Sequence, residues 1–139
     1  SRGIGDVYKR QARSSLENVQ HVPNFSPKIA EAQVYINDHY TEHLTLSQVA
    51  SHLNLNESYF RHLFKDEMQI SFKSYVTLLR LAHAQKLLIA SQRSINEIIQ
   101  EVGYSNITQF YKIFELNYNL TPAEYRRRYR DSYADAPPL

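Results

Sequence analysis

Two short stretches of the chain carry side chains that could read the edge of a nucleic-acid base. In the first, Arg61 has a guanidinium that can donate two parallel hydrogen bonds to guanine O6 and N7. In the second, the carboxamide of Gln109 suits adenine, and Thr108 or Ile107 could contact a thymine methyl group. The same side chains are also ordinary on a solvated helix face, and Gln109 could instead cap a helix by bonding back to Asn106. The elements that position these residues must decide between the two interpretations.

Apolar spacing divides each stretch into an inner and an outer helix face. Phe60, Leu63 and Phe64 recur at helical spacing in the first stretch. Phe110 and Phe114 do so in the second, and we expect all five to face a core. The outward positions are the candidate contact residues: Ser58, Arg61, His62 and Lys65 in the first stretch, and Ile107, Thr108, Gln109 and Lys112 in the second. The second set is less polar, and we predict that it discriminates bases less.

Little else in the sequence suggests chemistry. His39 and His43 are four residues apart with Glu42 between them, which invites a metal site, but no third ligand is evident and surface histidines are favoured. The chain has no cysteine, which excludes thiolate metal sites, thiol nucleophiles and disulfides. It also lacks a glycine-rich phosphate loop, a pair of catalytic acids and a nucleophile–base signature. We therefore expect no enzyme activity, no cofactor and no metal ion.

The two stretches belong to a pattern that the chain carries twice. Each copy has a capping residue, a helix of about two turns, a tight turn and a longer helix with aromatic residues inside, which is typical of a helix-turn-helix. The first copy comprises Thr45, Leu46, Val49, Ala50, Leu53, Phe60, Leu63 and Phe64, and the second Ser94, Ile95, Ile98, Ile99, Val102, Phe110, Ile113 and Phe114. The longer helices, here called the recognition helices, are predicted near residues 57–68 and 107–117.

Capping signals predict the remaining elements. Four pairs place a side-chain acceptor three residues before Glu or Gln: Thr45 with Gln48, Ser94 with Glu97, Asn106 with Gln109, and Thr121 with Glu124. Ser26 should cap a helix that ends near His39 or Tyr40. Ser71 can cap a connecting helix of about twenty residues with apolar side chains on two sides, and a last helix is expected over about 122–130. Without any strand pattern, the sequence predicts an all-α fold of about seven helices.

Composition describes one small soluble domain. With 139 residues, of which 42% are hydrophobic, the chain can bury one core or two very small ones that share an element. No apolar run approaches the roughly eighteen residues of a membrane span, and the lack of cysteine is compatible with a cytoplasmic protein. We expect the domain to occupy residues 26–131. A disordered lead-in or linker is expected at 1–25, with 1–11 resembling vector sequence, and a disordered tail at 132–139.

Charge and length together point toward nucleic acid. The chain has a net charge of +2, but residues 44–130 contain eleven Lys and Arg against seven Asp and Glu, a net charge of +4. This excess supports nucleic-acid binding only weakly. The length of the connecting helix is stronger evidence for DNA binding, because about twenty residues separate the two motifs by about 30 Å. Major-groove faces of B-DNA repeat every 34 Å or so, and the two recognition helices could therefore enter adjacent major grooves.

A set of residues in both repeats matches the pattern of a known family. They are 103–110, Phe114 and 121–126 in the second repeat, and Ala50, 63–65, Ser71, Phe72, Tyr75, Arg80 and Ala84 in and after the first. On these residues, the segment 44–128 resembles the DNA-binding domain of the AraC/XylS-type transcription regulators. The resemblance implies base contacts by Ser58, Arg61 and His62, with Lys65 nearer phosphate. Gln69 and Asn119 stand where the family usually has glycine; Asn119 adopts a left-handed turn more easily than Gln69 does.

The resulting hypothesis is sequence-specific binding of double-stranded DNA by a transcription regulator. The resemblance implies that the intact regulator is longer and carries a domain for effector sensing or dimerisation that is absent from this chain. Besides DNA, the expected partner is RNA polymerase or that absent domain. The alternative is a helical protein-interaction module without DNA specificity, which the apolar Ile107 and Ile113 favour.

Overall fold

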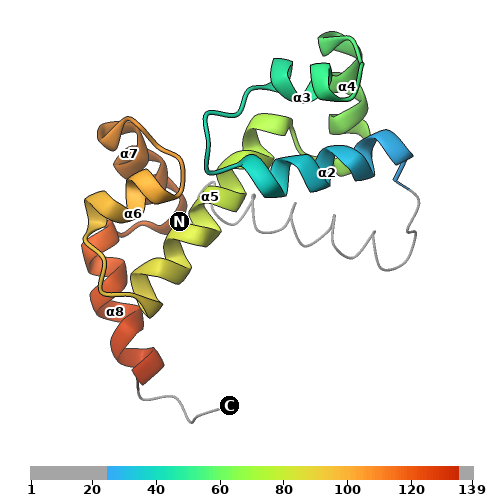
Figure 1. The fold of residues 1–139 in the computed structure, drawn as a ribbon. Helices are drawn as coiled ribbons and strands as arrows, with labels where there is room; N and C mark the ends of the chain where they lie inside the picture. The colour runs from blue at the N-terminus through green and yellow to red at the C-terminus, as the bar shows by residue number, and fades with distance from the viewer. Residues whose placement is uncertain (1–24, 135–139) are drawn as a thin grey trace.

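The computed structural model describes the backbone of residues 25–134 and the side chains of residues 25–130 (Figure 1). Within this range the chain forms seven helices and no strand, which confirms the expected all-α fold. The helices are α2 (Pro27–His39), α3 (Leu46–His52), α4 (Glu57–Met68), α5 (Phe72–Ala90), α6 (Ile95–Glu101), α7 (Ile107–Tyr118) and α8 (Pro122–Ala134). None of the described helices is long and apolar enough to cross a membrane. Of the lead-in predicted at 1–25, residues 1–24 lie outside the described part of the chain. Phe25 does not fit that prediction, because its side chain is partly buried against the first hydrophobic cluster.

Two lobes lie at opposite ends of α5 (Figure 1). The first lobe contains α2, α3 and α4, and the second contains α6, α7 and α8. Each lobe has its own hydrophobic cluster, and the predicted inner aromatics, Phe60 and Phe64 in one and Phe110 and Phe114 in the other, are fully buried. Of the two possibilities that the length allowed, the described residues show two small hydrophobic cores that share α5.

The central helix α5 serves both cores, but not with the same face. Phe72 and Val76 are buried in the first cluster, whereas Leu81, Ala84 and Leu88 are buried in the second. Val76 and Leu81 are five residues apart, which is about 140° around a helix that turns about 100° per residue. The lobes consequently pack on different sides of α5, as predicted from the apolar side chains on two sides of this helix.

The predicted caps form, with one exception. Thr45 with Gln48, Ser94 with Glu97, and Thr121 with Glu124 each make both reciprocal hydrogen bonds between a side chain and a backbone amide. At Asn106, the side chain accepts from the Gln109 amide at 3.0 Å, but the return bond is not formed among the described residues. Each helix-turn-helix therefore begins at a closed capping box on its first helix.

The last helix is longer than the sequence predicted. It continues to Ala134 instead of ending near Arg130, so helix occupies the first residues of the segment 132–139 that was expected to be a tail. The reason is chemical: residues 131–134 contain neither glycine nor proline, and the first helix-breaking proline is Pro137. Residues 135–139 lie outside the described part of the chain.

Candidate nucleic-acid interface

The two recognition helices are α4 and α7, within one residue of the predicted bounds. In both, an asparagine in the turn begins the helix. The Asn56 side chain accepts from the amides of Ser58 and Tyr59, and the Asn106 side chain accepts from the amide of Gln109. These bonds satisfy amides that have no partner within the first turn of a helix. The first turn of each recognition helix is thus held by side chains from the preceding turn of the motif.

All eight candidate contact residues are exposed. They are Ser58, Arg61, His62 and Lys65 on α4, and Ile107, Thr108, Gln109 and Lys112 on α7. Ile107 has 43% of its surface exposed, which places it outside the core. Ile113, by contrast, is partly buried against the second cluster. The outward faces predicted from spacing therefore exist, and a contact with DNA by any of the eight stays a prediction.

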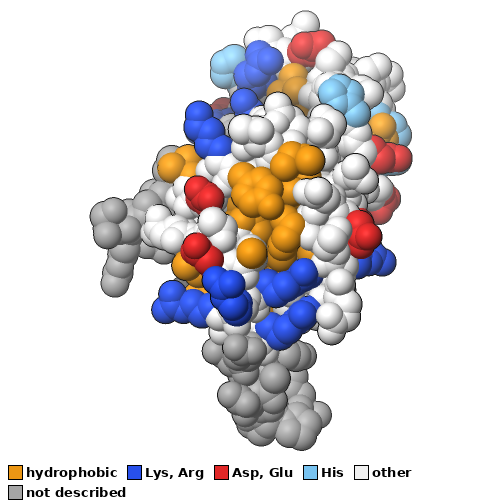
Figure 2. All heavy atoms as spheres, turned by 90° about the vertical axis from the view of Figure 1, so that its left-hand side faces the viewer, with side chains coloured by type: hydrophobic (Ala, Val, Ile, Leu, Met, Phe, Trp, Pro, Cys, Tyr) orange, Lys and Arg blue, Asp and Glu red, His pale blue; other side chains and the backbone are white. Residues whose placement is uncertain are grey.

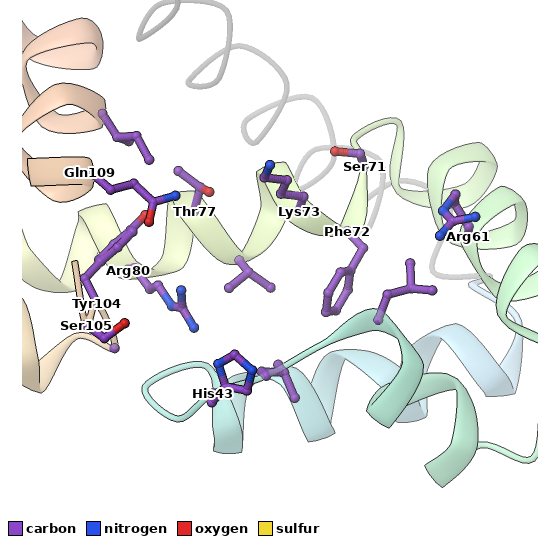
Figure 3. A pocket seen from close by; sticks show the side chains of 15 residues that line it. His43, Arg61, Ser71, Phe72, Lys73, Thr77, Arg80, Tyr104, Ser105 and Gln109 are labelled. Atoms are coloured by element: carbon purple, nitrogen blue, oxygen red, sulfur yellow. The ribbon is translucent and has the colours of Figure 1, made fainter.

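An open groove of about 560 Å³ lies between the lobes. Figure 3 shows Arg61 at one end and Gln109 toward the other, with α5 running between them. The groove thus joins one candidate from each recognition helix. The other six candidates do not line it.

The floor of this groove holds polar residues that the sequence reasoning missed. Lys73, Thr77 and Arg80 of α5 line it, together with His43 from the loop after α2 (Figure 3). Lys73, Thr77 and Arg80 are separated by four and three residues, which places them on one face of a helix. The spacing of this polar stripe can be recognised in the sequence. Only the packing of both lobes on α5, however, shows that the stripe lies between the recognition helices.

Two of the candidates have their orientation set locally. His62 donates from Nδ1 to the carbonyl oxygen of Ser58 at 2.7 Å, because a carbonyl can only accept, and this leaves Nε2 pointing away from that bond. The Gln109 carboxamide does not close a capping box, so it does not act as the capping partner of Asn106. Both side chains consequently keep a hydrogen-bonding group for a partner.

The arginines of α8 divide into two groups. Arg126 donates to the carbonyl oxygens of Leu88 and Ser91, and Arg130 also bonds to Ser91, so both cations bind the C-terminal end of α5. The negative end of a helix dipole favours cations in this position. Burial, with Arg130 nearby, lowers the pKa of Arg126 from its ordinary value. Arg127 and Arg128 remain exposed.

A metal site is not supported within residues 25–130. His39 bonds through Nδ1 to Glu42, and Tyr35 stacks against the rings of both His39 and His52. No group of three His, Cys, Asp or Glu side chains in the described part of the chain could hold a metal ion. His39 and His52 thus take part in ring stacking, and His39 also bonds to Glu42.

Comparison with known proteins identifies the family of this chain. A helix-turn-helix domain model matches residues 49–128. The chain belongs to this family. It is 33% identical over 123 residues to the lactose operon transcription activator of Staphylococcus xylosus, covering 88% of this chain and 40% of that protein. The resemblance to AraC/XylS-type regulators is thereby confirmed.

Two solved structures share the fold. One is the C-terminal domain of AraT, a response regulator from Geobacillus stearothermophilus, with a TM-score of 0.72, 35% identity, and coverage of 74% of this chain and 86% of that one. The other is a transcriptional regulator from Chromobacterium violaceum described as containing an AraC-type DNA-binding domain, with a TM-score of 0.67 and 26% identity over 80% of this chain and 96% of that one. The double helix-turn-helix therefore makes up most of each of these two solved chains.

Proposed function

We propose that residues 26–131 form the sequence-specific, double-stranded DNA-binding unit of a transcription regulator, with α4 and α7 entering two adjacent major grooves. The observation that carries the proposal is the groove, which joins Arg61 of α4 to Gln109 of α7 across the polar stripe of α5. Two exposed recognition helices on one rigid spacer are what a single chain needs to contact two successive grooves.

The length of α5 suits this arrangement. Its 19 residues span about 28 Å at about 1.5 Å per residue, somewhat less than the roughly 34 Å turn of B-DNA. Bending of the DNA would bring the two grooves to the smaller separation. Arg61 would read guanine in one groove, while Gln109 and Thr108 would read an A·T pair in the other. Lys65, Lys73 and Lys112 would contact phosphate.

This chain spans 40% of the length of its lactose-operon relative, which supports a longer intact regulator. We propose that the remainder supplies effector sensing or dimerisation, and that the DNA-bound regulator acts on RNA polymerase. The relative's description as a transcription activator supports such a contact. Catalysis is not part of the proposal.

Selection from a randomised duplex library tests the proposal. The wild-type chain should enrich two short sequence blocks about one helical turn apart. Arg61→Ala should relax the preference in one block, costing roughly 1–3 kcal/mol against the correct base, and Gln109→Ala should relax the other by less. Lys86→Ala is the matched control, because it removes an exposed cation of α5 that does not line the groove.

A protein-interaction module is the competing function, and exposed apolar groups favour it. Leu116 on α7 and Tyr129 on α8 have 50% and 39% of their surface exposed. Figure 2 shows apolar side chains gathered in the middle of the molecular face that carries α6, α7 and α8, with Lys and Arg side chains above and below them. If no motif is enriched and binding disappears as salt rises, the affinity is nonspecific and this function gains support.

A further inference from the structure

The junction between the two lobes is polar. The hydrophobic clusters of the lobes are separate, and α5 passes from one to the other between Val76 and Leu81. Arg80 lies at this crossing, partly buried. A helix shared by two small cores could bend or let each lobe rock on it, so the groups around Arg80 determine how firmly the two recognition helices are placed.

Arg80 binds the first lobe through its backbone. Its Nε donates to the carbonyl oxygen of Tyr40 at 2.8 Å, and its Nη2 donates to that of Glu42 at 2.9 Å. Tyr40 is the C-terminal cap of α2, where helix carbonyls attract a cation. The planar guanidinium thus holds two carbonyls of one loop in a fixed geometry that a lysine cannot reproduce.

The same guanidinium contacts the second lobe. Its carbon lies 5.2 Å from the centre of the Tyr104 ring, within the range of a cation–π interaction. The preceding residue, Gly103, has φ of +109° and packs so closely that a Cβ there would lie 2.9 Å from the Tyr40 carbonyl oxygen and 3.0 Å from Arg80 Nε. The turn of the second motif therefore sits directly against the loop of the first lobe.

A second bond anchors that loop to α5. The hydroxyl of Tyr40 lies 3.0 Å from Nδ1 of His83, and the two rings meet edge to face. His83 is three residues from Arg80 on α5, on the same side of the helix. Tyr40 is thus held to the connecting helix by both its backbone and its side chain.

We propose that Arg80, with Tyr40, Glu42, Gly103 and Tyr104, forms a junction that fixes the distance between the recognition helices and thereby sets which half-site spacing the protein accepts. Arg80 is a positioning residue in this proposal, which rests on the proposed DNA-binding function. Two of its donors are already used on carbonyl oxygens, which argues against a phosphate as its main partner.

A distance measurement tests the junction without DNA. Because the chain has no cysteine, spin labels can be attached at Asp66→Cys on α4 and Glu115→Cys on α7, both exposed positions. The wild-type background should give a narrow distance distribution by pulsed electron resonance. Arg80→Ala should broaden it, and Arg80→Lys should broaden it too, since the charge remains but the two-carbonyl fork is lost. An unchanged distribution in both variants would overturn the junction.

Binding to spaced sites tests the consequence. On duplexes whose two half-sites are moved apart or together by one or two base pairs, the wild type should lose about tenfold in affinity per step, and Arg80→Ala less than about threefold. Affinity for a single half-site should stay within about twofold, with Lys86→Ala as the charge-matched control. A uniform loss at every spacing, with a shallower salt dependence, would make Arg80 a phosphate contact instead. If the wild type shows no sequence preference at all, the proposed function fails while the distance result still stands.

Discussion

Gln69 ends the first recognition helix in the left-handed region, with φ of 60°. The equivalent residue of the second motif, Asn119, has φ of 58°. The sequence anticipated strain at Gln69, because side chains other than Asn and Asp rarely adopt this conformation. Gln69 offsets part of the cost by donating from its side-chain amide to the Asp66 carbonyl at 2.7 Å. The packing of the motif therefore holds Gln69 in a left-handed conformation that glutamine itself disfavours.

Replacing this residue should stabilise the protein. Gln69→Gly removes the Cβ clash, which is worth about 1 kcal/mol of unfolding free energy after the lost side-chain bond is counted. Chemical denaturation followed by circular dichroism measures the effect. Asn119→Gly is the matched comparison and should gain less, because asparagine tolerates the left-handed region. An equal gain at both positions, or a loss at Gln69, would show that φ is not what limits stability there.

His83 should make stability depend on pH. Burial lowers the pKa of His83 below its usual 6.5, and the cations Lys86 and Arg93 lower it further. The unfolded chain then binds a proton at His83 more readily than the folded chain does. Its contribution to the unfolding free energy is present above pH 6.5 and is lost as the pH falls through the lower pKa of the folded state.

Urea denaturation at a series of pH values between 7.5 and 5.5 measures this loss. His83→Asn keeps a group that can accept the Tyr40 hydroxyl bond but does not titrate, so its unfolding free energy should fall less over the same range. Identical pH dependence in the two proteins would show that His83 contributes nothing to it.

At the scale of elements, the capping residues explain why the helix starts could be predicted from the sequence. Helix starts at Thr45, Ser94 and Thr121 carry both halves of a capping box in the sequence, and all three boxes form. The end of α8 carried no such signal, since nothing after Arg130 stops a helix before Pro137. Local chemistry thus determined the helix starts here, while a helix end without a breaking residue could not be placed.

Removing one capping box should cost measurable stability. In Ser94→Ala the hydroxyl that accepts from the Glu97 amide at 3.1 Å is lost, and the unfolding free energy should fall by about 1 kcal/mol. Ser47→Ala, at an exposed position inside α3, is the control and should change it by less than about 0.5 kcal/mol. A similar effect in both variants would mean that the cap does not support α6.

At the scale of the whole molecule, the placement of side chains was harder to predict than their exposure. Periodicity alone identified the outward faces of α4 and α7, because it depends only on residues within one helix. It could not show that Lys73 and Arg80 lie in the groove that Arg61 and Gln109 border, since that depends on how two lobes pack on different sides of α5. Contacts across lobes need the three-dimensional arrangement.

The same arrangement predicts which cations contribute to the salt dependence of DNA binding. The net charge of the chain is only +2, so affinity for a polyanion must come from where the cations lie. Lys73 is exposed and lines the groove between the recognition helices, where the DNA backbone between two adjacent major grooves would pass. Lys73→Ala should therefore reduce the slope of log affinity against log salt by about one, while leaving the selected sequence unchanged. Titrations of a selected duplex at several salt concentrations measure that slope. Lys86→Ala should keep the wild-type slope, and a changed base preference in Lys73→Ala would move this residue from phosphate contact to base reading.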